Sequence, residues 1–353
     1  MGDLIYGIDF GGSTIRIGTV DPETGEIVDS VFSRSLIGVT DNKELTDMVV
    51  GQMPKHARIG ICAAGSVDEE NCIVTLSPNS GIKGNITFGQ DLRKLGHDVV
   101  MTNDMKAAVC AAARFGEGKG YENVLVATYS SGFNCAVARK KQVVTTAEFG
   151  HLLYELANDM KCGCGGYSHL ETAVSGNGAR DRAIKHFKNH RDQRDPQRGN
   201  HTILRFALDE LMRKTDARSY NVRSYNVYDP NMLANDDKLY ERVLESITSK
   251  HVYQAFVANP DEHPQKKIRE DQIRAIAVSF GMMVSAFNPI GIMVLMGSQT
   301  KDWHLLFAPA INKYCNEKFQ LPSLAHPDIV RTELPEIGVQ GAVAYGLQSS
   351  RKD

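Results

Sequence analysis

The densest group of chemically capable side chains lies between residues 148 and 171. Four of them are of the types that zinc accepts as ligands: His151, Cys162, Cys164 and His169. A closed structural zinc site takes four Cys or His ligands in a tetrahedron, and this segment supplies that number. The alternative is that these residues pack in a loop without a metal, as a lone Cys-x-Cys pair usually does. The full set of four favours a structural zinc site.

Two carboxylates, Glu148 and Glu171, are interleaved with these ligands. An ionised carboxylate only accepts hydrogen bonds, which suits it to the hydroxyl groups of a sugar. A loop fixed by a metal ion would hold both carboxylates in place. The segment therefore indicates a sugar pocket beside the zinc.

A second pattern is typical of phosphate binding. Asp9 stands just before a turn made of Gly11, Gly12, Ser13 and Thr14. Backbone N–H groups of such a turn can hold phosphate while the carboxylate holds Mg²⁺. We expect the glycines to take positive φ or to let a ligand approach closely, although a plain hairpin turn fits the same letters. Ser131 and Gly132 form a second candidate phosphate turn.

Asp104 is the candidate catalytic base. It follows Asn103 at the junction between a predicted strand and an alanine-rich predicted helix, 105–114. An aspartate there is often only a helix cap. Opposite a phosphate-binding turn, however, it could take the proton of an acceptor hydroxyl during phosphoryl transfer.

The whole chain sets the frame for these sites. It has 353 residues and a formal net charge of −2, which suggests two lobes and gives no support to nucleic-acid binding. No signal peptide or apolar membrane-spanning run is expected, so we expect a cytoplasmic protein with no membrane partner. Seven cysteines form an odd, uneven set that fits buried thiols and a metal pair better than disulfides.

Hydrophobic patterning predicts an α/β protein with two hairpins, one in each half, and a cleft between the lobes. Strands are expected at 4–9, 15–20, 57–63, 99–102, 124–128, 136–139 and 292–296, with helices at 105–114, 273–287 and 338–347. We expect residues 1–117 to form the N-terminal lobe, onto which about 339–353 packs back, and 118–338 the C-terminal lobe. A polar stretch, about 186–270, predicts an inserted helical subdomain or lid, or else a solvated surface.

Taken in order, the motifs resemble those of the ROK family of sugar kinases and repressors, within the actin-like, Hsp70-like ATPase superfamily. They are Asp9-Phe-Gly-Gly-Ser-Thr14, Ala64-Gly-Ser-Val-Asp68, Ser77-Pro-Asn79, Asn103-Asp104, Glu148-Phe-Gly-His151, Cys162-x-Cys164, His169-x-Glu171, Asn288-Pro289, Val294-Leu-Met-Gly297 and Gly341-Ala342. The resemblance implies a two-lobed actin-like (ribonuclease H-like) fold with a central cleft.

The resemblance also implies functional roles. Asp104 would be the general base toward the 6-hydroxyl of a sugar, and ATP-Mg would be the phosphoryl donor. The sugar pocket would contain Gly65, Asn79, Asn103, Glu148, His151 and Glu171, and the nucleotide site Asp9, Gly11, Gly12, Ser13, Thr14, Ser131, Gly132 and Gly297. His151 would bind zinc and a sugar hydroxyl at once. A homodimer is implied as well.

Three departures from the family pattern stand out. His169 replaces a usual cysteine, Thr14 a frequent lysine, and Asn134-Cys135 replace glycines of the second turn. The last two substitutions could weaken nucleotide binding. The leading interpretation is a kinase of glucose, with N-acetylmannosamine, N-acetylglucosamine or fructose as alternatives. The alternative of another class is a non-catalytic sugar-binding regulator. The first predicted hairpin starts by residue 4 and leaves no room for the DNA-binding domain of family repressors, so an enzyme is favoured.

Overall fold

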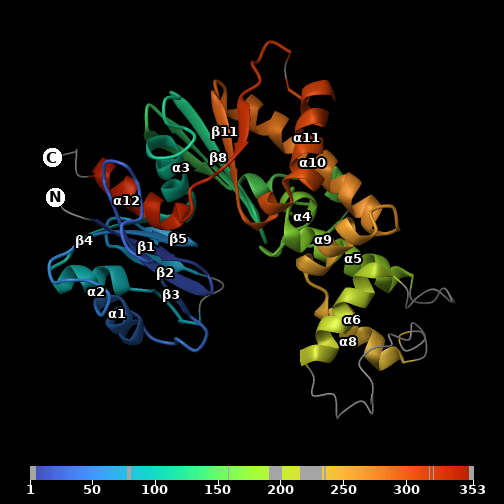
Figure 1. The fold of residues 1–353 in the computed structure, drawn as a ribbon, viewed down its shortest axis with the longest axis horizontal. Helices are drawn as coiled ribbons and strands as arrows, with labels where there is room; N and C mark the ends of the chain where they lie inside the picture. Colours follow the sequence, from blue (N-terminus) through green and yellow to red (C-terminus); the bar gives the residue numbers. More distant parts are fainter. Residues whose placement is uncertain are drawn as a thin grey trace.

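The protein is described by a computed structural model that covers residues 5–77, 81–157, 159–190, 201–214, 233, 236–317, 319–320 and 322–349. Within these residues, two five-stranded sheets occupy separate lobes (Figure 1). Their strand orders are β3-β2-β1-β4-β7 and β10-β9-β8-β11-β12. In both sheets the first three strands of the lobe are antiparallel, and the last two run parallel to the first. The two lobes therefore repeat one topology.

The N-terminal sheet follows from short apolar runs. Its strands are β1 (Ile5–Phe10), β2 (Thr14–Val20), β3 (Phe32–Ser35), β4 (Arg58–Ala63) and β7 (Asp98–Asn103), and a small hairpin, β5 (Ser66–Asp68) and β6 (Ile73–Leu76), lies beside them. Helices α1 (Asn42–Val50) and α2 (Phe88–Lys94) pack on the same core as β1 and β4. Central strand β4 is almost wholly buried, as expected for a parallel strand covered on both faces.

The C-terminal lobe has more helices. Its strands are β8 (Asn123–Tyr129), β9 (Phe133–Arg139), β10 (Gln142–Ala147), β11 (Ile292–Met296) and β12 (Asp328–Arg331). Its helices are α4 (Glu171–Val174), α5 (Gly176–Asn189), α6 (Thr202–Lys214), α8 (Asp237–Ser246), α9 (Ser249–Ala258), α10 (Gln265–Phe287) and α11 (Trp303–Glu317), with short 3₁₀ turns at Phe149–His151, Glu155–Ala157 and Ser298–Asp302. On the other face of this sheet lies α3 (Asp104–Arg114), whose small side chains share a core with β8 and β11.

The C-terminal helix α12 (Ile337–Ser349) returns to the N-terminal sheet (Figure 1). The helix backbone comes so close that only glycine fits beneath it. A Cβ on Gly7 would lie 2.2 Å from the carbonyl oxygen of Val339, and one on Gly60 would lie 2.1 Å from that of Ala342. Helix α12, near the C-terminus, thus packs directly on β1 and β4 of the N-terminal sheet.

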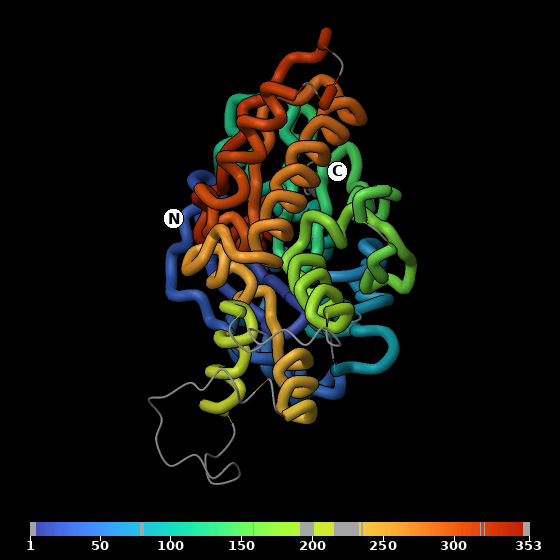
Figure 2. The backbone as a smooth tube through the Cα atoms, turned by 90° about the vertical axis from the view of Figure 1, so that its right-hand side faces the viewer, coloured from blue at the N-terminus to red at the C-terminus, as the bar shows by residue number. Residues whose placement is uncertain are grey.

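The described part of the polar segment 186–270 is built into the C-terminal lobe. Leu204 of α6, Tyr240 of α8 and Phe256 of α9 are buried in the same core as Leu125 of β8. Figure 2 shows α6 and α8 at one end of the molecule. The alternative of a merely solvated surface is therefore wrong for these helices. The helix predicted at 273–287 begins eight residues earlier, at Gln265.

Neither Gly11 nor Gly12 takes positive φ, so the positive-φ alternative is wrong for this turn, and close approach of a ligand stays a prediction. The first turn is closed instead by a hydrogen bond from the Gly11 N–H to the Thr14 carbonyl, 2.9 Å. Among the described residues, every helix is too short or too polar to cross a bilayer.

Candidate active site

Asp104 is held at the start of α3, directly after β7. Asn103 is the N-cap: its side-chain oxygen accepts a hydrogen bond from the Met105 N–H at 2.9 Å, and an Asp104 oxygen accepts from the same N–H at 2.9 Å. Burial raises the pKa of Asp104 to about 6, and the negative charges of Asp9 and Glu148 act in the same direction. A carboxyl with this pKa is ionised at neutral pH yet basic enough to accept a proton.

Asp9 lies near the end of β1, opposite Arg16 of β2. An Asp9 oxygen lies 3.2 Å from the Arg16 guanidinium, and the buried Cys62 thiol donates to the other oxygen at 3.4 Å. Burial raises the pKa of Asp9, whereas Cys62 and Arg16 lower it. Arg16 was not predicted as a site residue. The sequence could have indicated it, because Arg16 is two residues from Thr14 and alternate residues of a strand lie on the same face.

Gly65 and Asn103 are joined in the structure. The Asn103 amide donates to the Gly65 carbonyl at 3.0 Å. Gly65 has φ +118°, and a Cβ there would lie 2.0 Å from the Leu76 carbonyl oxygen, so a side chain is excluded. Asn79, the remaining residue expected in this part of the sugar pocket, lies outside the described residues.

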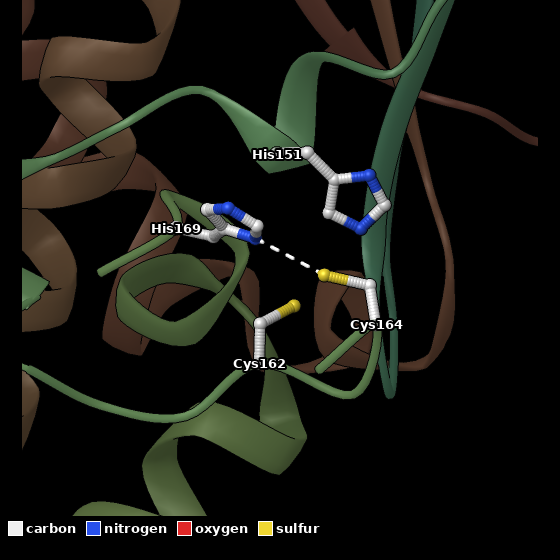
Figure 3. Close-up of side chains that lie close together, drawn as sticks. All are labelled: His151, Cys162, Cys164 and His169. Carbon is white, nitrogen blue, oxygen red and sulfur yellow. Dashed lines mark hydrogen bonds between the residues drawn. The ribbon is translucent and has the colours of Figure 1, made fainter. Parts of the chain in front are cut away.

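The four predicted zinc ligands converge (Figure 3). One ligand atom from each of His151, Cys162, Cys164 and His169 can be chosen so that all lie within 4.8 Å of one another. The Cys164 sulfur is 3.3 Å from His169 Nδ1. Ligands at about 2.0–2.3 Å from a tetrahedral ion are separated by roughly 3.3–3.8 Å, so this donor set fits zinc.

Glu148 and Glu171 border this cluster from two sides. Glu148 Oε2 lies 3.5 Å from His151 Nδ1, and the Glu148 side chain is 77% exposed. Glu171 accepts a hydrogen bond from the Phe133 N–H at 3.0 Å and from the Cys162 thiol at 3.4 Å. One carboxylate is therefore open to a ligand, and the other is fixed beneath the β8–β9 turn.

Two of the departures from the family pattern, Asn134 and Cys135, lie in β9 just after the β8–β9 turn. The Asn134 amide donates to Glu148 Oε2 at 3.4 Å, toward the proposed sugar side. Cys135 is fully buried in the core of the C-terminal lobe. Neither of these contacts involves Ser131, which the prediction assigned to phosphate.

A hollow of about 340 Å³ adjoins the same turn. The Ser130 carbonyl accepts hydrogen bonds from the Gly176 N–H and the Gln299 amide, both at 2.8 Å. Gly297 has φ +100° and lies against the Tyr129 backbone. The hollow is lined by Gly176, Ser249, Lys250, Tyr253, Gln254, Val257, Ser298, Gln299 and Asp302. Sequence reasoning missed the contribution of α9, because its polar residues carry no motif.

The sequence profile of the ROK family matches residues 5–348. The chain belongs to the ROK family. It is 26% identical over 355 residues to a glucokinase of Thermotoga maritima, covering 96% of both chains. Among solved structures, it resembles a ROK glucokinase from Streptomyces griseus in complex with glucose and AMPPNP (TM-score 0.67, 22% identity, 98% and 99% of the two chains). It also resembles a ROK hexokinase from Thermus thermophilus (TM-score 0.71, 18% identity, 99% and 100%).

These likenesses confirm both the predicted family and the predicted two-lobed actin-like fold. Within this ROK fold, carboxylates from both lobes come within electrostatic reach of one another. Asp9 lies in β1 and Asp104 directly follows β7, two strands of the N-terminal sheet, and Glu148 directly follows β10 of the C-terminal sheet. Glu171 contacts Cys162 and Glu148 contacts His151, so both carboxylates border the Cys/His cluster, and both also contact residues of β9 next to the β8–β9 turn.

Proposed function

We propose that this ROK protein is an ATP-dependent sugar kinase that phosphorylates the 6-hydroxyl of a hexose, with glucose as its first substrate. The observation that carries the proposal is the position of Asp104 at the start of α3, near the carboxylates of Asp9 and Glu148, where burial and these charges raise its pKa. An aspartate that served only as a solvated helix cap would not need a buried position near two other carboxylates. The family membership and the similarity to a glucokinase support the same activity.

In the proposed reaction, Asp104 accepts the proton of the sugar hydroxyl as the oxygen attacks the γ-phosphorus of ATP. A new P–O bond forms, and the bond to the bridging oxygen breaks, so that ADP leaves with that electron pair. Glu148, Glu171 and His151 would orient the other hydroxyls by accepting or donating hydrogen bonds. Positioning supplies most of the acceleration, and the base contributes about 10²- to 10⁴-fold.

We place the nucleotide across the two phosphate turns. Asp9 would hold Mg²⁺ through water, with the backbone of residues 11–14 and of Ser131 and Gly132 on the phosphates. The hollow beside Gly297 and α9 would take the adenosine part, because it opens next to the Ser130 turn. Thr14 and Arg16, on one face of β2, would stand in for the lysine frequent in the family.

The proposal includes a structural zinc ion on His151, Cys162, Cys164 and His169, supported by the mutual approach of their ligand atoms. When bound, zinc would connect the 3₁₀ turn Phe149–His151 rigidly to the segment 162–169 that leads into α4. The nearby Glu148 carboxylate would help to fix the orientation of the His151 ring. The loop would then present Glu148 to the sugar with little conformational freedom.

A coupled assay of ADP release tests the activity. Wild-type protein should turn over ATP only when a hexose is present, and Asp104→Ala should lose at least about 10²-fold in kcat. A panel of glucose, N-acetylmannosamine, N-acetylglucosamine and fructose identifies the substrate. Substantial residual turnover in Asp104→Ala would remove this residue from the role of base.

The candidate of another class is a sugar-binding regulator that lacks the nucleotide grip, and Thr14 is the observation that favours it. Calorimetry with ATP-Mg²⁺ and with each sugar separately distinguishes the two. If the protein is a regulator, it should bind sugar alone, and if it is a kinase, it should bind both.

Light scattering tests the implied homodimer. Limited proteolysis tests the proposed lobes, residues 1–117 with 339–353 and residues 118–338.

A further inference from the structure

Away from the proposed active site, three histidine rings from two separate segments are in contact. His186 and His190 lie at the C-terminal end of α5, and His263 lies in the connection between α9 and α10. The ring centroids of His186 and His190 are 4.2 Å apart, and those of His186 and His263 are 4.8 Å apart. The proposed kinase reaction uses none of the three.

The spacing on α5 is suited to chelation. Residues four apart lie on one face of a helix, so His186 and His190 are neighbours on the surface. His190 Nδ1 lies 2.8 Å from the His186 carbonyl oxygen. Because a carbonyl can only accept, Nδ1 carries the proton and Nε2 keeps its lone pair. Ligating histidines commonly have this arrangement, in which one ring nitrogen donates to a backbone carbonyl and the other binds the metal.

Packing alone accounts poorly for the cluster. His190 and His263 are exposed and His186 is only half-buried, so stacking their rings removes little apolar surface from water. Protonating any one ring would also disfavour protonation of its neighbours. Imidazoles that are held together at a surface are good ligands for zinc, nickel and copper.

We propose that His186, His190 and His263 form a second metal site, which binds a divalent transition-metal ion such as zinc or nickel through imidazole nitrogens only. The rings now lie stacked (29°) and edge to face (62°), so binding requires the His186 and His263 side chains to rotate until a nitrogen of each faces His190 Nε2. Bound metal ties the end of α5 to the start of α10. Both helices also pack in the core of the C-terminal lobe.

Cobalt(II) is the probe that separates this site from the cysteine-containing one. After removal of bound metal with a chelator, the full-length protein is titrated with Co²⁺. Cobalt bound by Cys162 and Cys164 gives an intense thiolate-to-metal absorption band, whereas cobalt on imidazoles gives only weak d–d bands. We expect about two ions per chain in the wild type, one of each kind.

Matched variants assign each ion. His186→Ala/His190→Ala should bind about one ion and keep the thiolate band, and Cys162→Ser/Cys164→Ser should bind about one ion without it. His263→Ala, an exposed single change, should also weaken the imidazole site if the double variant folds poorly. The control His56→Asn alters an exposed histidine of the N-terminal lobe and should leave both ions bound.

Two results would overturn the proposal. One is a wild-type chain that binds cobalt only with the thiolate band. The other is a folded His186→Ala/His190→Ala variant that still binds a second, non-thiolate ion. Because metal stoichiometry and spectra are measured without ATP or sugar, the outcome is independent of whether the protein is a kinase.

Discussion

The raised pKa of Asp104 predicts that the candidate base costs the protein stability. The pKa rises from 3.8 to about 6, chiefly through burial, so the folded protein binds the proton more tightly than the unfolded chain. Each tenfold change in acidity corresponds to about 1.4 kcal/mol, which makes the effect about 3 kcal/mol. For an acid with a raised pKa, stability is complete below pH 3.8, declines as the pH rises toward 6, and stays lower above it.

The perturbation is Asp104→Asn, which keeps a side-chain oxygen for the Met105 N–H but has no charge to desolvate. At pH 7 the variant should therefore be up to about 3 kcal/mol more stable than the wild type. With an unfolding entropy of roughly 2.1 cal/mol/K per residue, that gain raises Tm by about 4 °C. Near pH 4 the difference should disappear, because the wild-type carboxyl is then protonated in the folded state.

Two assays check the prediction on the same preparations. Differential scanning calorimetry between pH 4 and pH 8 follows Tm, and the coupled kinase assay follows kcat/KM for the sugar. In the wild type, kcat/KM should rise with pH through about 6 as Asp104 ionises. Asp98→Asn is a matched control, since the Asp98 side chain is 69% exposed and its removal should change Tm little.

The reasoning is refuted if Asp104→Asn is inactive but has the wild-type Tm at pH 7. That result would mean that Asp104 is well solvated, and that its neighbours do not raise its pKa. An active and stabilised variant would refute only the catalytic assignment. The two measurements therefore test the electrostatics and the chemistry separately.

Three further predictions address other parts of the molecule. Gly60→Ala should destabilise the fold by about 1–3 kcal/mol in thermal unfolding, because its Cβ would lie 2.1 Å from a carbonyl of α12. Tyr253→Phe should raise KM for ATP about fivefold and leave KM for the sugar unchanged, because it removes the 2.8 Å hydrogen bond to Gln299 beside the Ser130 turn. His169→Ala should lower zinc content in elemental analysis and weaken sugar binding in calorimetry, and retention of both would contradict a structural role for the metal.

The central strands and the edge strand β7 could be predicted from the sequence, whereas the edge strands β3, β10 and β12 could not. Strands β1, β2, β8, β9 and β11 are apolar runs that the patterning located to within a few residues. In contrast, β3 is largely exposed and reads Phe-Ser-Arg-Ser, and β12 has only partly buried apolar positions. An edge strand buries little surface, so its pairing is fixed by the neighbouring strand rather than by its own composition.

The candidate site also has one part that could be predicted from the sequence and one that could not. The convergence of His151, Cys162, Cys164 and His169 could be predicted because they are close together in the chain, and the place of Asp104 at the start of a helix because it follows a strand end. The charge of Glu148 on Asp104 could not, since it depends on how two lobes are placed. The hollow beside α9 was missed for the same reason. Lys250 and Tyr253 gain their position only when α9 packs next to the Ser130 turn.

The structure also changes which departures from the family pattern are expected to affect nucleotide binding. Cys135 is buried and Asn134 contacts Glu148, so the two residues that were expected to disturb the phosphate grip bear on the core and on the proposed sugar side instead. Thr14 is then the one remaining departure in the predicted phosphate-binding residues, and Arg16 presents a cation on the same face of β2, 3.2 Å from Asp9. At the β8–β9 turn, the Phe133 N–H donates to Glu171 and the Ser130 carbonyl accepts from the Gln299 amide. The proposed sugar and nucleotide contacts thus meet at residues 130–134. In an enzyme that uses both substrates, a substitution there is expected to alter the binding of both, whereas in a protein that binds sugar alone it should alter only sugar binding.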